Sequence, residues 1–250
     1  NAFYDCWELK RIDLSKLDKL NVLSNKLFCY STIENISIPS NIIEVKNDCF
    51  ANLLYLNHIE LAPENKCLSY FDDEKKIIVG KSDMKSDVFD NLLFVNRDDK
   101  ELIIPSSIKC ICSFALYNSK IEYVKISKSV NIIENNAFDK CKNLKEIEFE
   151  YDRSENIEIQ YHAFATSKIK SVSIPAKNAN VELLAFSECI NMHSIEIIAD
   201  DIYIDWIYNN RDILIYSFPE SKTISTDTIS FMFHSECKPI LYVKHHTVLK

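Results

Sequence analysis

Glycine is almost absent from this sequence, with one residue in 250. The phosphate-binding loops of nucleotide-binding folds need several glycines within a few residues, so the composition excludes loops of that kind. The turns of the chain must then be made by asparagine, aspartate, serine and proline, which also favour turn conformations.

Positive charge is also scarce: 29 basic residues face 37 acidic ones, and the net charge is −8. Nucleic-acid binding depends on neutralising phosphates with Lys and Arg, so this balance argues against a nucleic-acid partner. The sequence has no apolar run of 18 residues, and we therefore predict no membrane-spanning segment in this chain.

What the chain does contain is a repeat, seen most clearly in Val130–Ile147, where an aliphatic residue, an Ala-Phe pair, a Cys and L-x-x-I follow one another. The aromatic position of the pattern falls at Phe3, Phe28, Phe50, Leu116, Phe138, Phe164 and Phe186. The spacing is 22 to 26 residues, apart from one interval of 66, which is three times 22. A fixed period in this range is typical of a solenoid.

Two further columns keep step with the aromatic one. Three residues after it lies a Cys or a Ser, as at Cys6, Cys141 and Cys189 or at Ser119 and Ser167, with Leu53 as the exception. Because Ser replaces Cys at the same position, we expect these cysteines to be free thiols that fill the core. After them come segments with apolar first, fourth and sixth residues, which predict parallel strands at 9–14, 33–38, 56–61, 121–126, 144–149, 169–174 and 192–197.

The whole chain, 1–250, is therefore predicted to form a single solenoid with little helix. Residues 64–100 keep the length of the missing repeats but lose the pattern, and we interpret them as two irregular repeats; the pattern fades again after 199. The chain starts inside a repeat, without an initial Met, a visible signal peptide or a polar cap. We therefore expect it to be a segment of a longer protein.

The motif L-x-x-I-x-I-P, followed by an aliphatic residue and A-F-x-x-C at about 22 residues, resembles the BspA-like leucine-rich repeats. The resemblance implies a horseshoe-class leucine-rich-repeat solenoid with parallel β-strands on its concave face. It also implies a surface or secreted protein that adheres to host, matrix or cell-surface proteins, with no catalytic residues to carry over. The sequence departs from the motif at three positions: Leu116 replaces the Phe, and Leu27 and Cys49 replace the Ala.

The third and fifth residues of each predicted strand point out of the concave face. Binding hot spots favour Tyr, Trp and Arg. We therefore predict a protein-binding site on this face, formed by Arg11, His58, Tyr123, Lys125, Glu146 and Glu148. The alternative is that this face is only solvated, and that the ligand binds to loops or to repeats beyond the segment.

Other residues could suggest metal binding or catalysis. Cys110 and Cys112 resemble a metal pair only by their spacing, because C-x-C also fits the alternation of a strand, and no second Cys pair follows at the spacing of a zinc site. His245-His246 lacks further ligands nearby in sequence, and the Asp pairs at 72–73, 98–99 and 200–201 are scattered enough to be solvated. No nucleophile motif is present. We thus expect no metal, no cofactor and no enzymatic activity.

The function that follows is a non-enzymatic protein–protein interaction module, part of a surface or secreted adhesin. The alternative is an intracellular, cytoplasmic scaffold built on the same repeats, which would fit reduced cysteines and the missing signal peptide. The sequence does not identify the protein ligand.

Overall fold

The computed structural model describes residues 2–204, apart from 47, 153, 183 and 200, together with 214–217. Within these residues the secondary structure is all β, with no α-helix. No helix in this part of the chain could therefore cross a membrane. His245-His246, Asp200 and most of the chain predicted to be irregular after 199 lie outside the described residues.

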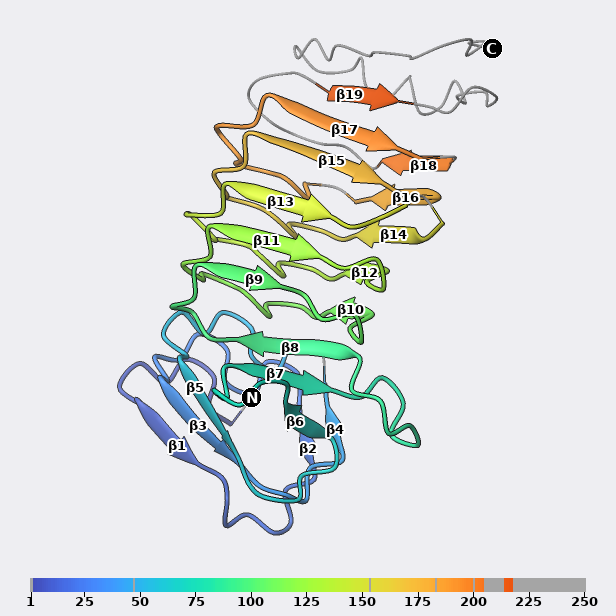
Figure 1. The fold of residues 1–250 in the computed structure, drawn as a ribbon. Helices are drawn as coiled ribbons and strands as arrows, with labels where there is room; N and C mark the ends of the chain where they lie inside the picture. The colour runs from blue at the N-terminus through green and yellow to red at the C-terminus, as the bar shows by residue number, and fades with distance from the viewer. Residues whose placement is uncertain are drawn as a thin grey trace.

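The predicted strands form a front stack of short parallel strands, in register from coil to coil (Figure 1). The stack consists of β1 (Arg11–Asp13), β3 (Asn35–Ile38), β5 (His58–Leu61), β9 (Glu101–Ile103), β11 (Tyr123–Ile126), β13 (Glu146–Phe149), β15 (Ser171–Pro175), β17 (Ser194–Ile198) and β19 (Leu214–Ser217). The solenoid with parallel strands is thus confirmed.

A second stack of parallel strands runs behind the first, and the sequence pattern did not predict it (Figure 1). It consists of β2 (Val22–Leu23), β4 (Glu44–Val45), β10 (Cys110–Ile111), β12 (Ile132–Ile133), β14 (Asn156–Ile159), β16 (Asn178–Val181) and β18 (Asp201–Ile204). Several of these strands have only two residues, too few to show the alternation by which a strand is detected in a sequence.

The aromatic column lies inside the coils. The rings of Phe138 and Phe164 stack with centroids 4.8 Å apart, and those of Phe164 and Phe186 at 5.2 Å. All three side chains are fully buried. The predicted internal column of phenylalanines is therefore confirmed, and the ring separations fall in the range of favourable stacking.

The Cys/Ser column packs beside the phenylalanines and bonds to their backbone. The thiol of Cys141 donates to the Leu116 carbonyl at 3.0 Å, and that of Cys189 to the Phe164 carbonyl at 3.2 Å. Ser31 Oγ makes a similar bond to the Phe28 carbonyl at 2.7 Å. Because a hydroxyl and a thiol can both satisfy a carbonyl of the aromatic position, Ser and Cys interchange here.

The turns around the aromatic column use the left-handed backbone region without glycine. Positive φ angles recur two residues before and two residues after the aromatic position, as at Asn136, Lys140, His162, Thr166, Leu184 and Glu188. Such a conformation costs roughly 1–2 kcal/mol for a non-glycine residue. Bonds between coils offset this cost: the Phe138 amide donates to the Ala163 carbonyl at 2.7 Å, and the Lys140 amide to the Ala165 carbonyl at 3.1 Å. The expectation that Asn, Asp, Ser and Pro make the turns was too narrow.

Residues 64–100, predicted as two irregular repeats, contain an antiparallel meander of β6 (Leu68–Tyr70), β7 (Ile77–Gly80) and β8 (Asn91–Val95). β8 also pairs in parallel with β10 and so continues into the back stack. The meander is buried on both faces. Ile78 and Phe94 belong to the core of the N-terminal coils, whereas Val79, Leu92 and Val95 belong to the core of the C-terminal coils. β7 and β8 thus form a partition between two hydrophobic cores.

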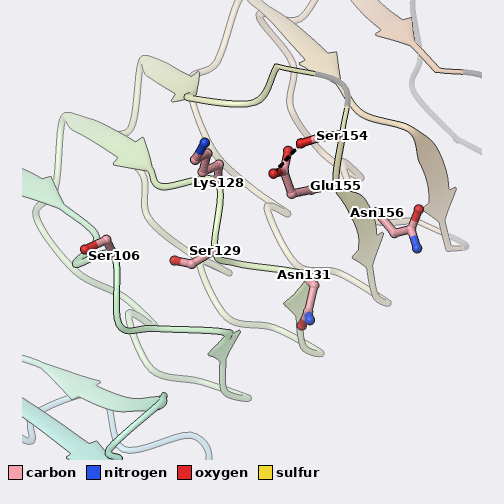
Figure 2. Close-up of a pocket in the computed structure, with 7 residues that line it drawn as sticks. All are labelled: Ser106, Lys128, Ser129, Asn131, Ser154, Glu155 and Asn156. Carbon is pink, nitrogen blue, oxygen red and sulfur yellow. Dashed lines mark hydrogen bonds between the residues drawn. The ribbon is translucent and has the colours of Figure 1, made fainter.

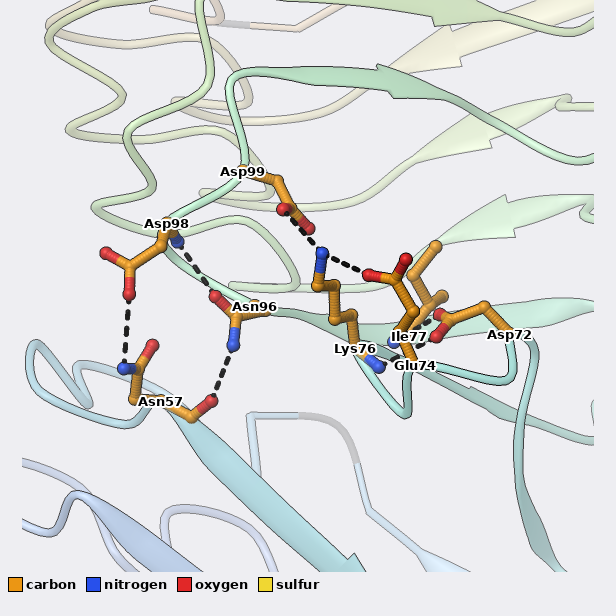
Figure 3. A network of polar contacts seen from close by, with 8 residues as sticks. All are labelled: Asn57, Asp72, Glu74, Lys76, Ile77, Asn96, Asp98 and Asp99. Carbon is orange, nitrogen blue, oxygen red and sulfur yellow. Dashed lines mark hydrogen bonds and ion pairs between the residues drawn. The ribbon is translucent and has the colours of Figure 1, made fainter.

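Polar contacts connect the meander to the preceding coil (Figure 3). Asn96 Nδ2 donates to the Asn57 carbonyl at 3.0 Å, and Asn57 Nδ2 donates to Asp98 Oδ2 at 3.3 Å. Lys76 Nζ pairs with Asp99 Oδ1 at 3.3 Å. Asp98 and Asp99, which we predicted as a solvated pair, therefore bind protein groups on both sides of the partition.

Candidate protein-binding face

The front face is the solvent-facing side of the strands from β1 to β17 in the front stack. Strand alternation buries every second residue in the core, as the burial pattern of β13 shows, and directs the others outward. Of the predicted site residues, Arg11, His58, Glu146 and Glu148 are exposed, and Tyr123 and Lys125 are half-buried. All six thus lie on the front face.

Four of these residues form a central patch on β11 and β13: Tyr123, Lys125, Glu146 and Glu148. Register places Tyr123 opposite Glu146, and Lys125 opposite Glu148. The Tyr123 hydroxyl donates to Glu148 Oε2 at 2.7 Å, and Lys125 Nζ lies 3.0 Å from Glu148 Oε1. Lys125 also pairs with Glu150 at 2.9 Å. The side chains of Tyr123, Lys125 and Glu148 therefore hold one another in defined positions.

The protonation states of the central patch follow from these contacts. The hydrogen bond from Tyr123, followed by that from Lys125, lowers the pKa of Glu148. The same bond raises the pKa of the Tyr123 hydroxyl, and bonds to Glu150 and Glu148 raise the pKa of Lys125. At neutral pH Lys125 thus carries an ammonium, Glu148 a carboxylate and Tyr123 a neutral phenol.

Ile103 borders the central patch and was not selected from the sequence. It lies opposite Lys125 on β9, and 66% of its surface is exposed. An isoleucine this exposed, beside ordered charged groups, gives the patch an apolar contact surface. Ile103 is an apolar residue at an outward position of its strand. An apolar residue at such a position was the sequence signal that could have identified it.

Arg11 and His58 are not part of the central patch. Both pair with Asn35, which lies between them on β3. Two strand spacings, about 10 Å, therefore separate their backbones. The meander of β6, β7 and β8 lies between these N-terminal coils and β9 (Figure 1). The six predicted residues thus form two separate groups rather than one site.

A groove on the turn side of the coils was missed by the sequence reasoning. It encloses about 440 Å³ and includes Tyr4, Tyr30, Asn52, Asn136 and Tyr161 in its lining. The rings of Tyr4 and Tyr30 meet edge to face at 5.6 Å. These tyrosines occupy turn positions outside the strand pattern, so no signal in the sequence distinguished them.

A second hollow, of about 490 Å³, lies at the edge of the loops (Figure 2). Ser154, Glu155 and Asn156 form one wall of it. The other lining residues are Ser106, Lys128, Ser129 and Asn131. We assign no ligand to this hollow.

Comparison with protein families agrees with this architecture. The model of the BspA type leucine rich repeat region matches residues 1–75 and 83–193 in six copies. The chain belongs to this family. A search of curated proteins finds no significant relative.

Solved structures share the fold. A leucine rich cell surface protein from Faecalibacterium prausnitzii A2-165 is 20% identical, with a TM-score of 0.62, over 81% of this chain and 62% of that protein. The pneumococcal vaccine antigen PcpA is 14% identical, with a TM-score of 0.61, over 96% and 69%. A leucine-rich repeat protein from Eubacterium ventriosum ATCC 27560 is 16% identical, with a TM-score of 0.55, over 76% and 48%. This chain thus spans less than two thirds of the first and third of these proteins.

Proposed function

We propose that this chain is a non-enzymatic protein-binding module of a surface or secreted adhesin, and that its partner is a host, matrix or cell-surface protein. Membership of the BspA-type family supports the proposal. So does the fold shared with a protein described as a cell surface protein and with one described as a vaccine antigen. The observation that carries it is the central patch beside the exposed Ile103.

The central patch has the properties of a binding hot spot. Tyr is enriched in such sites, where an apolar centre is surrounded by polar groups. The contacts of Glu148 with Tyr123 and Lys125 hold these side chains before a partner arrives. Less side-chain entropy is then lost on binding, which favours affinity.

The test measures binding of the purified chain to immobilised extracellular-matrix proteins and to intact host cells, by biolayer interferometry and flow cytometry. The variant carrying Tyr123→Ala and Ile103→Ser should bind at least about tenfold more weakly, a loss of about 1.4 kcal/mol or more. Ser171→Ala, an exposed residue on the front face of β15, serves as the matched control. It should bind like the parent chain.

Three other outcomes would count against parts of the proposal. Undiminished binding by the double variant would exclude the central patch as the contact surface. Loss of binding by Tyr30→Ser instead would assign the contact to the turn-side groove. If intact cells of the native source do not stain with an antibody against this chain but permeabilised cells do, the cytoplasmic scaffold replaces the adhesin.

A further inference from the structure

Cys110 and Cys112 lie on the same side of the chain, because side chains two residues apart on an extended segment point the same way. Their sulfur atoms are 3.9 Å apart. Ile111 between them points into the core. Glu134 of the next coil completes the group, and the three potential ligand atoms lie within 4.8 Å of one another.

The distance between the sulfurs fits a tetrahedral metal ion. With zinc–sulfur bonds of about 2.3 Å, two thiolates of one tetrahedron lie about 3.8 Å apart. The observed separation of 3.9 Å therefore needs little movement of Cys110 or Cys112. A carboxylate oxygen binds zinc at about 2.0–2.2 Å, and Glu134 is placed to supply it.

The carboxylate of Glu134 is already oriented by the coil before it. Ser113 donates to Glu134 Oε2 twice, from its amide at 2.9 Å and from its hydroxyl at 3.1 Å. Oε1 is left without a hydrogen bond from the described residues. Ligand carboxylates in metal sites are commonly held by hydrogen bonds of this kind, which fix the free oxygen toward the metal.

The surroundings favour a cation over two free thiolates. The carboxylates of Glu134 and Asp90 both place negative charge near Cys112. Asp90 is buried, but it accepts hydrogen bonds from Ser82 and pairs with Lys109 at 3.6 Å. It therefore contributes negative potential rather than a ligand atom.

We propose that Cys110, Cys112 and Glu134 form a binding site for a thiophilic divalent cation, with Zn²⁺ as the expected ion. On binding, each thiol releases its proton to the solvent, and two metal–sulfur bonds and one metal–oxygen bond form. The fourth position is open to water or to a donor atom of another molecule. The metal would connect two consecutive coils just after β8, at the point where the second stack of strands continues from the meander through β10.

The test is a titration of the fully reduced chain with Co²⁺, followed by displacement with Zn²⁺. We expect one Co²⁺ per chain, thiolate-to-cobalt charge-transfer absorption in the near ultraviolet, and loss of that absorption on addition of Zn²⁺. Cys110→Ser and Cys112→Ser should each abolish the absorption of the bis-thiolate site. Glu134→Gln should weaken the affinity at least tenfold, and because its amide oxygen can still accept from Ser113, the coil should stay folded.

Cys6→Ser is the matched control, since Cys6 is a half-buried free thiol of the first coil. It should bind Co²⁺ like the parent. The circular dichroism of each variant shows whether it is folded, and a rise in melting temperature with Zn²⁺ in the parent but not in Glu134→Gln gives a second readout. The proposal is overturned if the reduced parent shows no charge-transfer absorption, if Cys110→Ser keeps the parent's affinity, or if the pair proves to be a disulfide that resists mild reduction.

Discussion

Arg97 is buried without a counterion, and replacing it should make the protein more stable. It is 5% exposed, and its Nε, Nη1 and Nη2 atoms have no hydrogen-bond partner among the described residues. It follows Phe94 by three residues, the spacing that places Ser119 and Cys141 in the Cys/Ser column of later coils. A guanidinium thus occupies a column that elsewhere holds small side chains.

The expected gain can be worked from the cost of this charge. Burial lowers the pKa of Arg97 from its ordinary value to about 10. At about 1.4 kcal/mol for each pKa unit, the charged form is disfavoured by about 3 kcal/mol relative to water. The guanidinium lies 5.1 Å from the centre of the Phe94 ring, a contact that returns about 1–2 kcal/mol. Arg97→Met removes both effects and keeps an unbranched side chain, so it should gain about 1–2 kcal/mol.

Urea unfolding followed by circular dichroism measures this difference, with Arg97→Lys as the control that keeps a positive charge and should gain nothing. The pH dependence adds a second check. Because the folded pKa of Arg97 lies below the unfolded one, the unfolded chain binds more protons at pH values between about 10 and the ordinary pKa of arginine. The parent therefore recovers stability as pH rises above about 10. The advantage of Arg97→Met should be full below pH 10 and shrink above it. A Met variant less stable than the parent at pH 7 would refute the reasoning, since it would mean that the charge has a stabilising partner.

Three further predictions concern the core and the front face. Phe138→Ala should destabilise the chain by roughly 3–5 kcal/mol, and a melting curve within a degree of the parent's would show that Phe138 is not a core position. Cys141 and Cys189, separated by the Ser167 coil, are too distant for a disulfide; thiol counting under denaturing, non-reducing conditions should find both free, and two blocked thiols would contradict this. Asn35 begins the N-x-S sequon Asn35-Ile36-Ser37 but lies between neighbouring strands, so mass spectrometry of the native protein should find it unglycosylated; full occupancy with undiminished binding would exclude Arg11 and His58 as contacts.

The sequence predicted the parts of the fold that repeat. The spacing of Phe138, Phe164 and Phe186 predicted a column whose rings do stack. The same register placed Tyr123 and Lys125 outward on a parallel strand. Both inferences succeed because every coil packs against its neighbours in the same way, so the same residue types recur at the same positions in many copies.

The parts that could not be predicted depend on contacts made only once. Nothing local shows that Ile77–Gly80 pairs antiparallel with Asn91–Val95, because the apolar runs fit either direction of pairing. The approach of Glu134 to Cys110 and Cys112 depends on how two consecutive coils stack. Tyr30 joins the groove only because the N-terminal coils and the later ones face it together. In each case the tertiary arrangement, and not the repeat, determines which residues come into contact.

The left-handed turns also have an electrical consequence. Around each aromatic position the amides donate to the following coil: Leu116 to Ala137, Phe138 to Ala163 and Phe164 to Ala185. The peptide groups of the turn column therefore point the same way, each with a dipole of about 3.5 D. Unlike a β-sheet, whose strand dipoles largely cancel, this column accumulates partial positive charge toward its C-terminal coil and negative charge toward the N-terminal one. Amides elsewhere in each coil, such as those of Lys120, Lys145 and Lys168, donate to the preceding coil and oppose this column. The dipole is therefore confined to the turn side of the coils, where acidic groups are favoured at the C-terminal end of the column and basic groups at its N-terminal end.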